Sequence, residues 1–247
     1  MIDLRGVSFA YDSAPVLRDI ALFAPDSAIT ALIGPNGSGK STLLRLMARL
    51  LPAQGEVLID GRPAASYAPK ALARTLAFLP QSRAVPAISV ASLVAHGRFP
   101  YLGFSRVRTK ADDEAIERAL KLTGLEGYAQ RDLRTLSGGE RQKAYLAMLV
   151  AQDAQNLLLD EPTTFLDIAH QLELMQILRA LRDEGRCVVV VLHDIGQALS
   201  LCDRAALLHG GRLLFCGEPE DGALLPAVER AFGVRALRRE GIAFERT

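Results

Sequence analysis

The sequence contains little cysteine, and the cysteines it has are scattered. Cys187, Cys202 and Cys216 are odd in number and lack the spacing of a zinc site or of a redox pair. Disulfide frameworks are typical of small secreted proteins in oxidising compartments. We therefore expect reduced cytosolic thiols and a fold that depends on its hydrophobic core.

Long hydrophobic runs and an excess of one charge are also missing. No apolar run approaches the roughly 20 residues of a membrane-spanning helix, and no charged-then-apolar leader opens the chain. The 29 basic and 28 acidic residues give a net charge of +1, which offers no bulk electrostatic reason to bind nucleic acid or an anionic membrane. The length of 247 residues suits one large α/β domain.

A glycine-rich stretch is the first informative feature that is present. It consists of Gly34, Pro35, Asn36, Gly37, Ser38, Gly39, Lys40, Ser41 and Thr42, and it matches G-x-x-x-x-G-K-[ST]. Residues 29–33 predict a buried strand before it and residues 43–50 a helix after it, which favours a phosphate-binding loop over a glycine-rich turn. We expect Lys40 to reach the β- and γ-phosphates and the Ser41 hydroxyl to bind Mg²⁺.

Two carboxylates follow the apolar run of residues 157–159. At the carboxyl end of a buried parallel strand, Asp160 and Glu161 would point into a ligand crevice. Asp160 is suited to hold Mg²⁺, directly or through water, and Glu161 to orient or deprotonate an attacking water. A solvated strand end is the alternative, which the phosphate loop upstream disfavours.

A second glycine motif precedes the helix expected over residues 140–152. The free N–H groups of Ser137, Gly138 and Gly139 form a candidate anion site at its N-terminus. A simple helix cap would account for Ser137 and for one glycine. It would not account for two glycines followed by Glu140.

Apolar runs alternate with helical periodicity along the chain, as in α/β proteins. We expect strands at residues 2–9, 16–23, 29–33, 55–61, 75–81, 157–159 and 187–192, and a hairpin of residues 205–209 and 212–216 joined by Gly210 and Gly211. The spacing of apolar residues predicts helices over residues 112–122 and 168–181. Residues 90–152 carry little strand signal. We expect a helical subdomain of about residues 86–152 between two parts of a nucleotide-binding core, 1–85 and 153–220, with a tail of residues 221–247.

Taken in order, these motifs make the chain resemble the ATP-binding subunits of ABC transporters as far as about Pro219. Residues 34–42 match the Walker A loop, and residues 157–161 match Walker B with its catalytic glutamate. Residues 136–140 match the LSGGQ signature, with Glu140 where glutamine is usual. The resemblance implies an α/β P-loop NTPase fold, with a RecA-like core, an antiparallel β subdomain and an inserted α-helical signature subdomain. It implies ATP and Mg²⁺ as ligands.

Four further sites follow from the resemblance. Gln81 matches the Q-loop glutamine that contacts Mg²⁺ and the attacking water, although a polar loop residue is the alternative. His193 matches the switch histidine that senses the γ-phosphate, against a satisfied core histidine. Tyr11 matches the aromatic residue that stacks on adenine, against a half-buried aromatic. Phe165, Leu166 and Asp167 match the D-loop.

The family logic also implies partners. The active unit is a head-to-tail homodimer in which the signature of one subunit covers the nucleotide of the other. A chain without a spanning segment needs separate transmembrane permease subunits, and indirectly a substrate-binding protein, which places it in the cytoplasm at the inner face of the membrane. Glu140 would add negative charge near the triphosphate, unless Arg141 or Lys143 offsets it.

The cargo class rests on two stretches. Residues 161–171 and 96–103 resemble ATPases of importers for ferric siderophores, haem and cobalamin, and we favour a ferric siderophore. Phe99, Tyr101, Leu102 and Phe104 are either core or the contact with the membrane subunit. An exporter stays open as an alternative. A nucleic-acid or ribosome ATPase is disfavoured by the single cassette, and an inactive scaffold by the intact Lys40, Asp160, Glu161 and His193.

Overall fold

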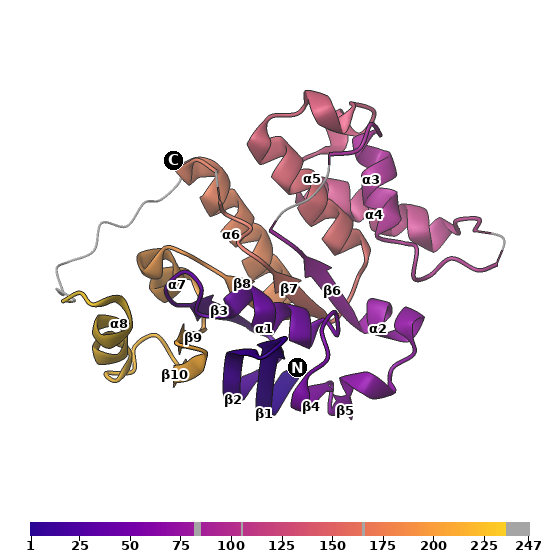
Figure 1. Ribbon diagram of the computed structural model, residues 1–247. Coiled ribbons are helices and arrows are strands. Elements are labelled where there is room, and N and C mark those ends of the chain that lie inside the picture. Colours follow the sequence, from indigo (N-terminus) through magenta and orange to yellow (C-terminus); the bar gives the residue numbers. More distant parts are fainter. Residues whose placement is uncertain (82–84, 105, 165, 236–247) are drawn as a thin grey trace.

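The computed structural model describes residues 1–81, 85–104, 106–164 and 166–235, and two β-sheets organise them (Figure 1). The smaller sheet is antiparallel, in the order β2-β1-β4-β5. Its strands are β1 (Ile2–Tyr11), β2 (Ala14–Ala24), β4 (Gln54–Ile59) and β5 (Arg62–Pro63).

The larger sheet has the order β10-β9-β3-β8-β7-β6, and only the β9–β10 pair is antiparallel. Its strands are β3 (Ala28–Ile33), β6 (Leu76–Leu79), β7 (Asn156–Leu159), β8 (Cys187–Val191), β9 (Arg204–His209) and β10 (Arg212–Gly217). The hairpin of β9 and β10 turns at Gly210 and Gly211, both with positive φ, as its glycines predicted. The α/β class expected from the sequence is confirmed.

Helix α1 (Lys40–Met47) lies between the two sheets and shares one core with both. Leu43 and Met47 of α1 pack in that core with Leu32 and Val191 of the larger sheet. Ile33 and Val190 belong to the core on the opposite face, which α6 (Ile168–Asp183) covers. Because successive side chains of a strand point to opposite faces, the continuous apolar runs of β3 and β8 fill both cores.

Three helices form a separate group beside α6 and β6, at the upper right of Figure 1. They are α3 (Val90–His96), α4 (Lys110–Leu122) and α5 (Gly138–Ala151), and they pack on one another. A buried ion pair joins the group: the Arg98 Nε atom donates to Asp112 at 2.9 Å, and Arg98 also donates to the carbonyl of Ala151. None of the helices described is long and apolar enough to cross a bilayer.

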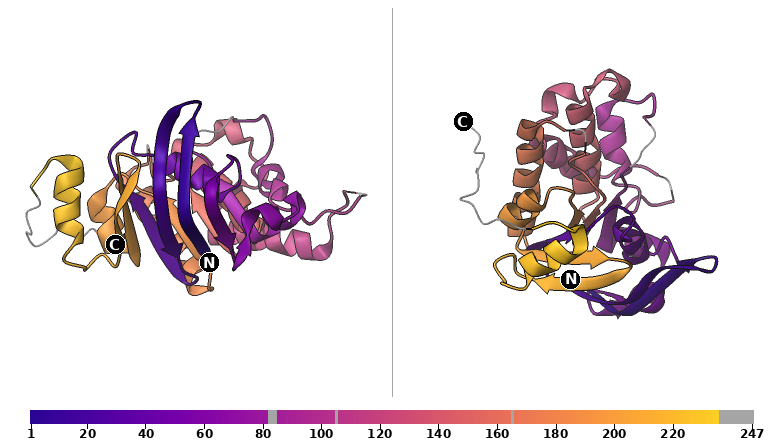
Figure 2. Two further views of the ribbon diagram at one scale, coloured as in Figure 1. Left: turned by 60° about the horizontal axis from the view of Figure 1, so that its bottom comes forward. Right: turned by 60° about the vertical axis from the view of Figure 1, so that its left-hand side comes forward.

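Three short helices complete the described chain. They are α2 (Pro69–Thr75), α7 (Ile195–Leu201) and α8 (Leu224–Phe232). Helix α8 contacts β9 and β10, at the opposite end of the molecule from α3 and α4 (Figure 2). The sequence had not predicted these helices, and the region after residue 220 was expected only as a tail.

Two predicted boundaries are wrong for local reasons. The helix expected over residues 43–50 begins at Lys40 and ends at Met47, because Arg49 takes a left-handed φ of 56° and the N–H of Leu50 bonds back to Arg45. The strand expected over residues 75–81 is Leu76–Leu79, since Thr75 closes α2, which Pro69 opens.

Candidate nucleotide-binding site

The parallel strands of the larger sheet bring their carboxyl ends to one edge. The glycine loop leaves β3, Asp160 and Glu161 follow β7, and His193 follows β8. Gln81 follows β6 at the edge of the sheet. A cavity of about 480 Å³ opens there, and its lining consists of Val16, Asn36, Gly37, Ser38, Gly39, Lys40, Ser41, Thr42, Gln81, Glu161 and His193.

The glycine loop leaves no space for side chains at two of its positions. A Cβ atom on Gly34, whose φ is 146°, would lie 2.1 Å from the carbonyl oxygen of Leu208. A Cβ atom on Gly39, whose φ is 103°, would lie 2.6 Å from the Leu17 side chain. Only glycine lets the loop turn this tightly between the sheets.

The Lys40 ammonium lies inside the curve of this loop. Its Nζ atom donates to the carbonyl of Gly34 at 2.7 Å and to that of Pro35 at 3.0 Å. Loss of hydration lowers the pKa of Lys40, while the charges of Glu161 and Asp160 oppose that change. The buried hydroxyl of Ser38 has no hydrogen-bond partner within the part of the chain described. Lysine and an unpaired hydroxyl in a glycine loop are donors that suit a phosphate.

Ser41 lines the cavity and is hydrogen-bonded to the buried Asp160. The Ser41 hydroxyl donates to Asp160 Oδ1 at 2.9 Å, and Asp160 is only 2% exposed. Burial raises the pKa of Asp160, while the Ser41 hydroxyl lowers it. No group of three or more His, Cys, Asp or Glu side chains in the described ranges could hold a metal ion. This hydroxyl–carboxylate pair could hold a hard dication that takes its other ligands from water and phosphate, as Mg²⁺ does.

Glu161 lies between three donors. Gln81 Nε2 donates to Glu161 Oε2, Thr164 donates to the same oxygen at 3.3 Å, and His193 Nε2 lies 2.7 Å from Oε1. The His193 side chain is 45% exposed and the Glu161 side chain 10%. Glu161 has a φ of 51°, a left-handed conformation that costs about 1–3 kcal/mol in residues other than glycine. The turn after β7 thus aims this carboxylate at the glycine loop.

The other predicted site residues lie outside this cavity. Tyr11 is 42% exposed at the end of β1, with its ring edge against Phe9. Ser137, Gly138 and Gly139 lie at the start of α5, and Asp167 caps α6 by accepting from the N–H of His170 at 2.9 Å. Leu166 precedes that cap, and Phe165 lies outside the described residues.

The Glu140 side chain forms a reciprocal cap with Ser137 at the start of α5. Its Oε2 atom accepts from the Ser137 N–H at 2.8 Å, and its own N–H donates to Ser137 Oγ at 3.2 Å. This reciprocal cap lowers the pKa of Glu140, mainly through the Ser137 N–H, with help from Tyr128 and Arg131. Arg141 donates to the Leu136 carbonyl and Lys143 pairs with Glu173, so the described contacts of these two cations are with other groups than Glu140.

Two residues of the site were missed from the sequence: Val16, which lines the cavity, and Thr164, which contacts Glu161. Val16, at the start of β2, gives no signal, because nothing in its neighbourhood marks it as different from a core valine. Thr164 does give one: a hydroxyl three positions after a catalytic-type carboxylate can reach back to it, as it does here.

The ABC transporter family profile matches residues 17–164. The chain belongs to the ABC transporter family. The predicted resemblance and P-loop fold are thereby confirmed, and the chain is an ATP-binding, ATP-hydrolysing protein of this family.

Two curated ABC transporter relatives cover nearly the whole chain. It is 41% identical over 240 residues to the ferric enterobactin transport ATP-binding protein FepC of Escherichia coli (strain K12), covering 95% of this chain and 88% of the relative. It is 42% identical over 237 residues to the petrobactin import ATP-binding protein FpuC of Bacillus anthracis, covering 95% and 87%. Among solved structures, cbiO1 from Clostridium perfringens, part of the ABC transporter complex cbiONQ, superposes with a TM-score of 0.79 at 25% identity over 93% of this chain and 92% of that one.

Proposed function

We propose that this chain is the ATPase that powers a membrane importer of ferric siderophores. The ATPase part rests on one observation: the Glu161 carboxylate is held by Gln81 and His193 beside the glycine loop. The cargo part rests on the relatives, two of which are named for ferric enterobactin and petrobactin. Haem or cobalamin is the alternative cargo.

In the proposed mechanism, the glycine loop holds the phosphates through its N–H groups and Lys40. When bound, Mg²⁺ would neutralise phosphate charge, held through Ser41, Asp160 and the amide oxygen of Gln81. Glu161 then accepts a proton on a carboxylate oxygen from the attacking water. Gln81 and His193 contact the two oxygens of that carboxylate before nucleotide binds and thereby restrain it. Both donors must turn towards phosphate or ion before an oxygen of Glu161 is free to contact the attacking water.

The proposed active unit is a head-to-tail homodimer. We infer that the helix N-terminus at Ser137, Gly138 and Gly139 is an anion site, and these residues are not among those that line the cavity of their own chain. In the dimer it would cover the γ-phosphate of the partner, with Asp167 beside it and Tyr11 on the adenine. The division into a core of residues 1–85 and 153–220 and a helical subdomain of residues 86–152 belongs to the same proposal, since closure needs two bodies.

The proposed membrane partner is a transmembrane permease, itself served by a substrate-binding protein. Phe99 is 57% exposed and Phe104 fully exposed on the segment after α3. This apolar pair would dock on the permease, which would hold the chain at the inner face of the membrane. We propose no nucleic-acid partner.

Uptake of radiolabelled ferric siderophore tests this proposal. A strain that lacks the chain should lose uptake, the wild-type chain should restore it, and the Glu161→Gln variant should not. Restoration by Glu161→Gln would overturn the proposed ATPase role. If the deletion strain loses haem or cobalamin uptake and keeps siderophore uptake, the cargo assignment is wrong while the ATPase stands.

A further inference from the structure

Within one chain, the ring of His170 lies against Gly139. A Cβ atom on Gly139 would come within 2.7 Å of His170 Cδ2, 2.9 Å of Cγ and 3.0 Å of Nε2. A Cβ atom on Gly138 would meet nothing within 4 Å. The second glycine of the signature therefore has a reason inside its own subunit: the ring occupies the volume that a side chain would need.

Asp167 fixes that ring in place. Its Oδ1 atom lies 2.7 Å from His170 Nδ1 and accepts from the His170 backbone N–H at 2.9 Å. These two bonds join Asp167 to His170 across the first turn of α6, which leaves the ring little freedom. His170 thus joins the carboxylate of Asp167 to the backbone of Gly139.

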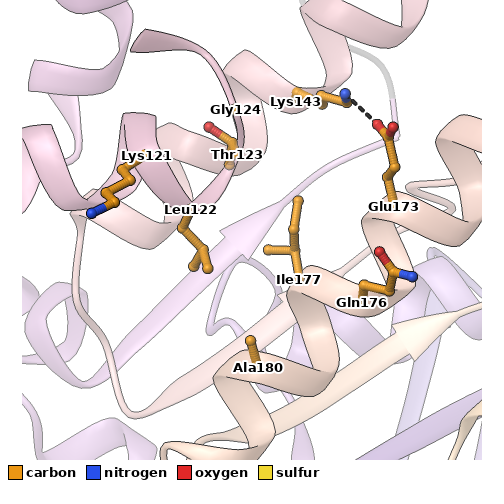
Figure 3. Close-up of a pocket in the computed structure, with 9 residues that line it drawn as sticks. All are labelled: Lys121, Leu122, Thr123, Gly124, Lys143, Glu173, Gln176, Ile177 and Ala180. Atoms are coloured by element: carbon orange, nitrogen blue, oxygen red, sulfur yellow. Dashed lines mark ion pairs between the residues drawn. The ribbon is translucent and has the colours of Figure 1, made fainter.

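Two other contacts hold the start of α5 to the same part of the chain. Gln142 Nε2 donates to the carbonyl of Pro162 at 2.7 Å. One helical turn beyond Gly139, Lys143 forms an ion pair with Glu173 of α6, across the pocket drawn in Figure 3. Gly139 and Lys143 lie four residues apart on α5, and the residues they meet, His170 and Glu173, lie three apart on α6. At these positions one face of α5 therefore lies opposite one face of α6.

We propose that His170 is a positioning residue, whose ring holds Gly139 and the signature N–H groups in the geometry that grips the partner's nucleotide. This inference rests on the proposed head-to-tail dimer. His170 does not line the nucleotide cavity of its own chain, so its effect is expected on closure of the dimer and not on ATP binding by a single chain.

The test measures ATP-driven dimerisation by light scattering in the Glu161→Gln background. His170→Ala removes the ring and should weaken dimerisation about tenfold, which corresponds to about 1.4 kcal/mol. The ATP affinity of the monomeric chain should stay unchanged. His170→Asn should restore most of the loss, because its amide can donate to Asp167 and its planar group lies where the ring lay.

A double-mutant cycle then isolates the contact. Gly139→Ala should weaken dimerisation strongly while His170 is present and at least roughly threefold less in the His170→Ala background, since the new methyl group then has space. Gly138→Ala is the matched control, because its effect should not depend on residue 170. Melting temperatures identify any variant that fails to fold.

Additive effects of Gly139→Ala and His170→Ala, in chains that melt like the parent, would overturn the inference and leave the proposed function intact. Equal dimerisation of His170→Ala and the parent would do the same. So would a loss in His170→Ala that His170→Asn does not restore. If the Glu161→Gln parent does not dimerise with ATP, the composite site itself is wrong and the inference falls with it.

Discussion

At the scale of single residues, the site is organised around one carboxylate in an uncommon conformation. Glu161 takes a positive φ directly after the buried strand β7. Strain of this kind persists when the surrounding contacts determine the conformation, here Gln81 and His193 on either side of the carboxylate. The carboxylate proposed as the base is therefore placed by the backbone before any ligand arrives.

Glu161→Gln should lower ATP turnover by about 10²–10⁴-fold, because an amide cannot accept the proton of the attacking water. Nucleotide binding should survive, because Lys40 and the glycine loop are untouched, and the ATP-bound dimer should accumulate. The measurements are the steady-state ATPase rate and light scattering. Glu220→Gln, at an exposed position, is the control. Full turnover in Glu161→Gln would contradict the catalytic role, and Lys40→Ala should instead lose nucleotide binding.

Asp160→Asn should raise the melting temperature of the nucleotide-free chain. Burial raises the pKa of Asp160, so the folded state binds a proton at higher pH than the unfolded state does. Wild-type stability therefore falls as the pH rises through the folded-state pKa. Near neutral pH the variant should melt about 2–4 °C higher, the shift that about 1 kcal/mol produces in a domain of this size. The difference should disappear on acidification.

The same Asp160→Asn variant should lose Mg²⁺-dependent ATP affinity. A neutral amide can still accept from Ser41 but attracts a dication less strongly. Calorimetry with and without Mg²⁺ measures this loss, and Asp12→Asn at an exposed turn serves as control. A variant that is less stable at neutral pH would show that the carboxylate stabilises the empty site.

At the scale of elements, the aromatic segment after α3 has two parts with different physical roles. The Arg98 guanidinium carbon lies 3.7 Å from the centroid of the Tyr101 ring. Arg98 is itself buried and forms an ion pair with Asp112. Phe99 and Phe104 point outwards. The sequence alone grouped these aromatics as one cluster, but one part belongs to the packing of α3, α4 and α5 and the other is free surface.

Replacing Arg98 and replacing the two phenylalanines should therefore give opposite results. Arg98→Met leaves the buried Asp112 carboxylate without its cationic partner, with only Thr109 among the described residues donating to it, which should cost about 3–5 kcal/mol of stability. Phe99→Ala combined with Phe104→Ala should leave the melting temperature and the basal ATPase rate nearly unchanged, while stimulation by the reconstituted permease is lost. Thermal melting and ATPase assays with and without permease measure both. If the double variant melts as early as Arg98→Met, these phenylalanines are core.

Periodicity predicted the elements that have strong patterns. The sequence predicted β3, β7 and β8 because a strand covered on both faces is a continuous apolar run. It predicted the β9–β10 hairpin because two consecutive glycines between apolar runs indicate a tight turn. Helices α2 and α7 have seven residues each, too few for a 3.6-residue period to stand out. The start of α1 was missed because Lys40, Ser41 and Thr42 are polar yet helical.

The sequence named the residues of the candidate site one by one, but it did not give their arrangement. Motif patterns identified Lys40, Asp160, Glu161, Gln81 and His193 separately. That Gln81 and His193 reach the same carboxylate depends on the strand order β8-β7-β6, which no local pattern carries. Gly139 and His170 are likewise distant in sequence, and only packing shows why that position is glycine.

At the scale of the whole molecule, the glycine loop and the signature of one chain lie apart, and in the proposed dimer each would meet its counterpart on the partner. The glycine loop and Glu161 line one cavity, while the signature N-terminus lies at the start of α5 and outside it. Two defective chains should therefore complement each other. A mixture of Lys40→Ala and Ser137→Arg chains should form heterodimers with one intact composite site and one site broken twice.

ATP-driven dimerisation of that mixture should exceed the average of the two variants alone. The physical reason is that one intact site retains its contacts across the interface, whereas each homodimer has two damaged sites. Light scattering over a series of mixing ratios measures it, and a mixture of wild type with Lys40→Ala gives the reference curve. Strictly average behaviour at every ratio would rule out shared sites.

The order of strands in the larger sheet also sets when this protein can first act as an enzyme. Strand β3 ends at Ile33, directly before the glycine loop, whereas its two neighbours in the sheet, β8 and β9, begin only at Cys187 and Arg204. At translation rates of about 5–20 residues per second, the loop leaves the ribosome on the order of 10 s before its neighbours. During that interval His193 does not yet exist and β7 has no partner on one side. A growing chain is thus unable to complete this site until β8 and β9 have been made.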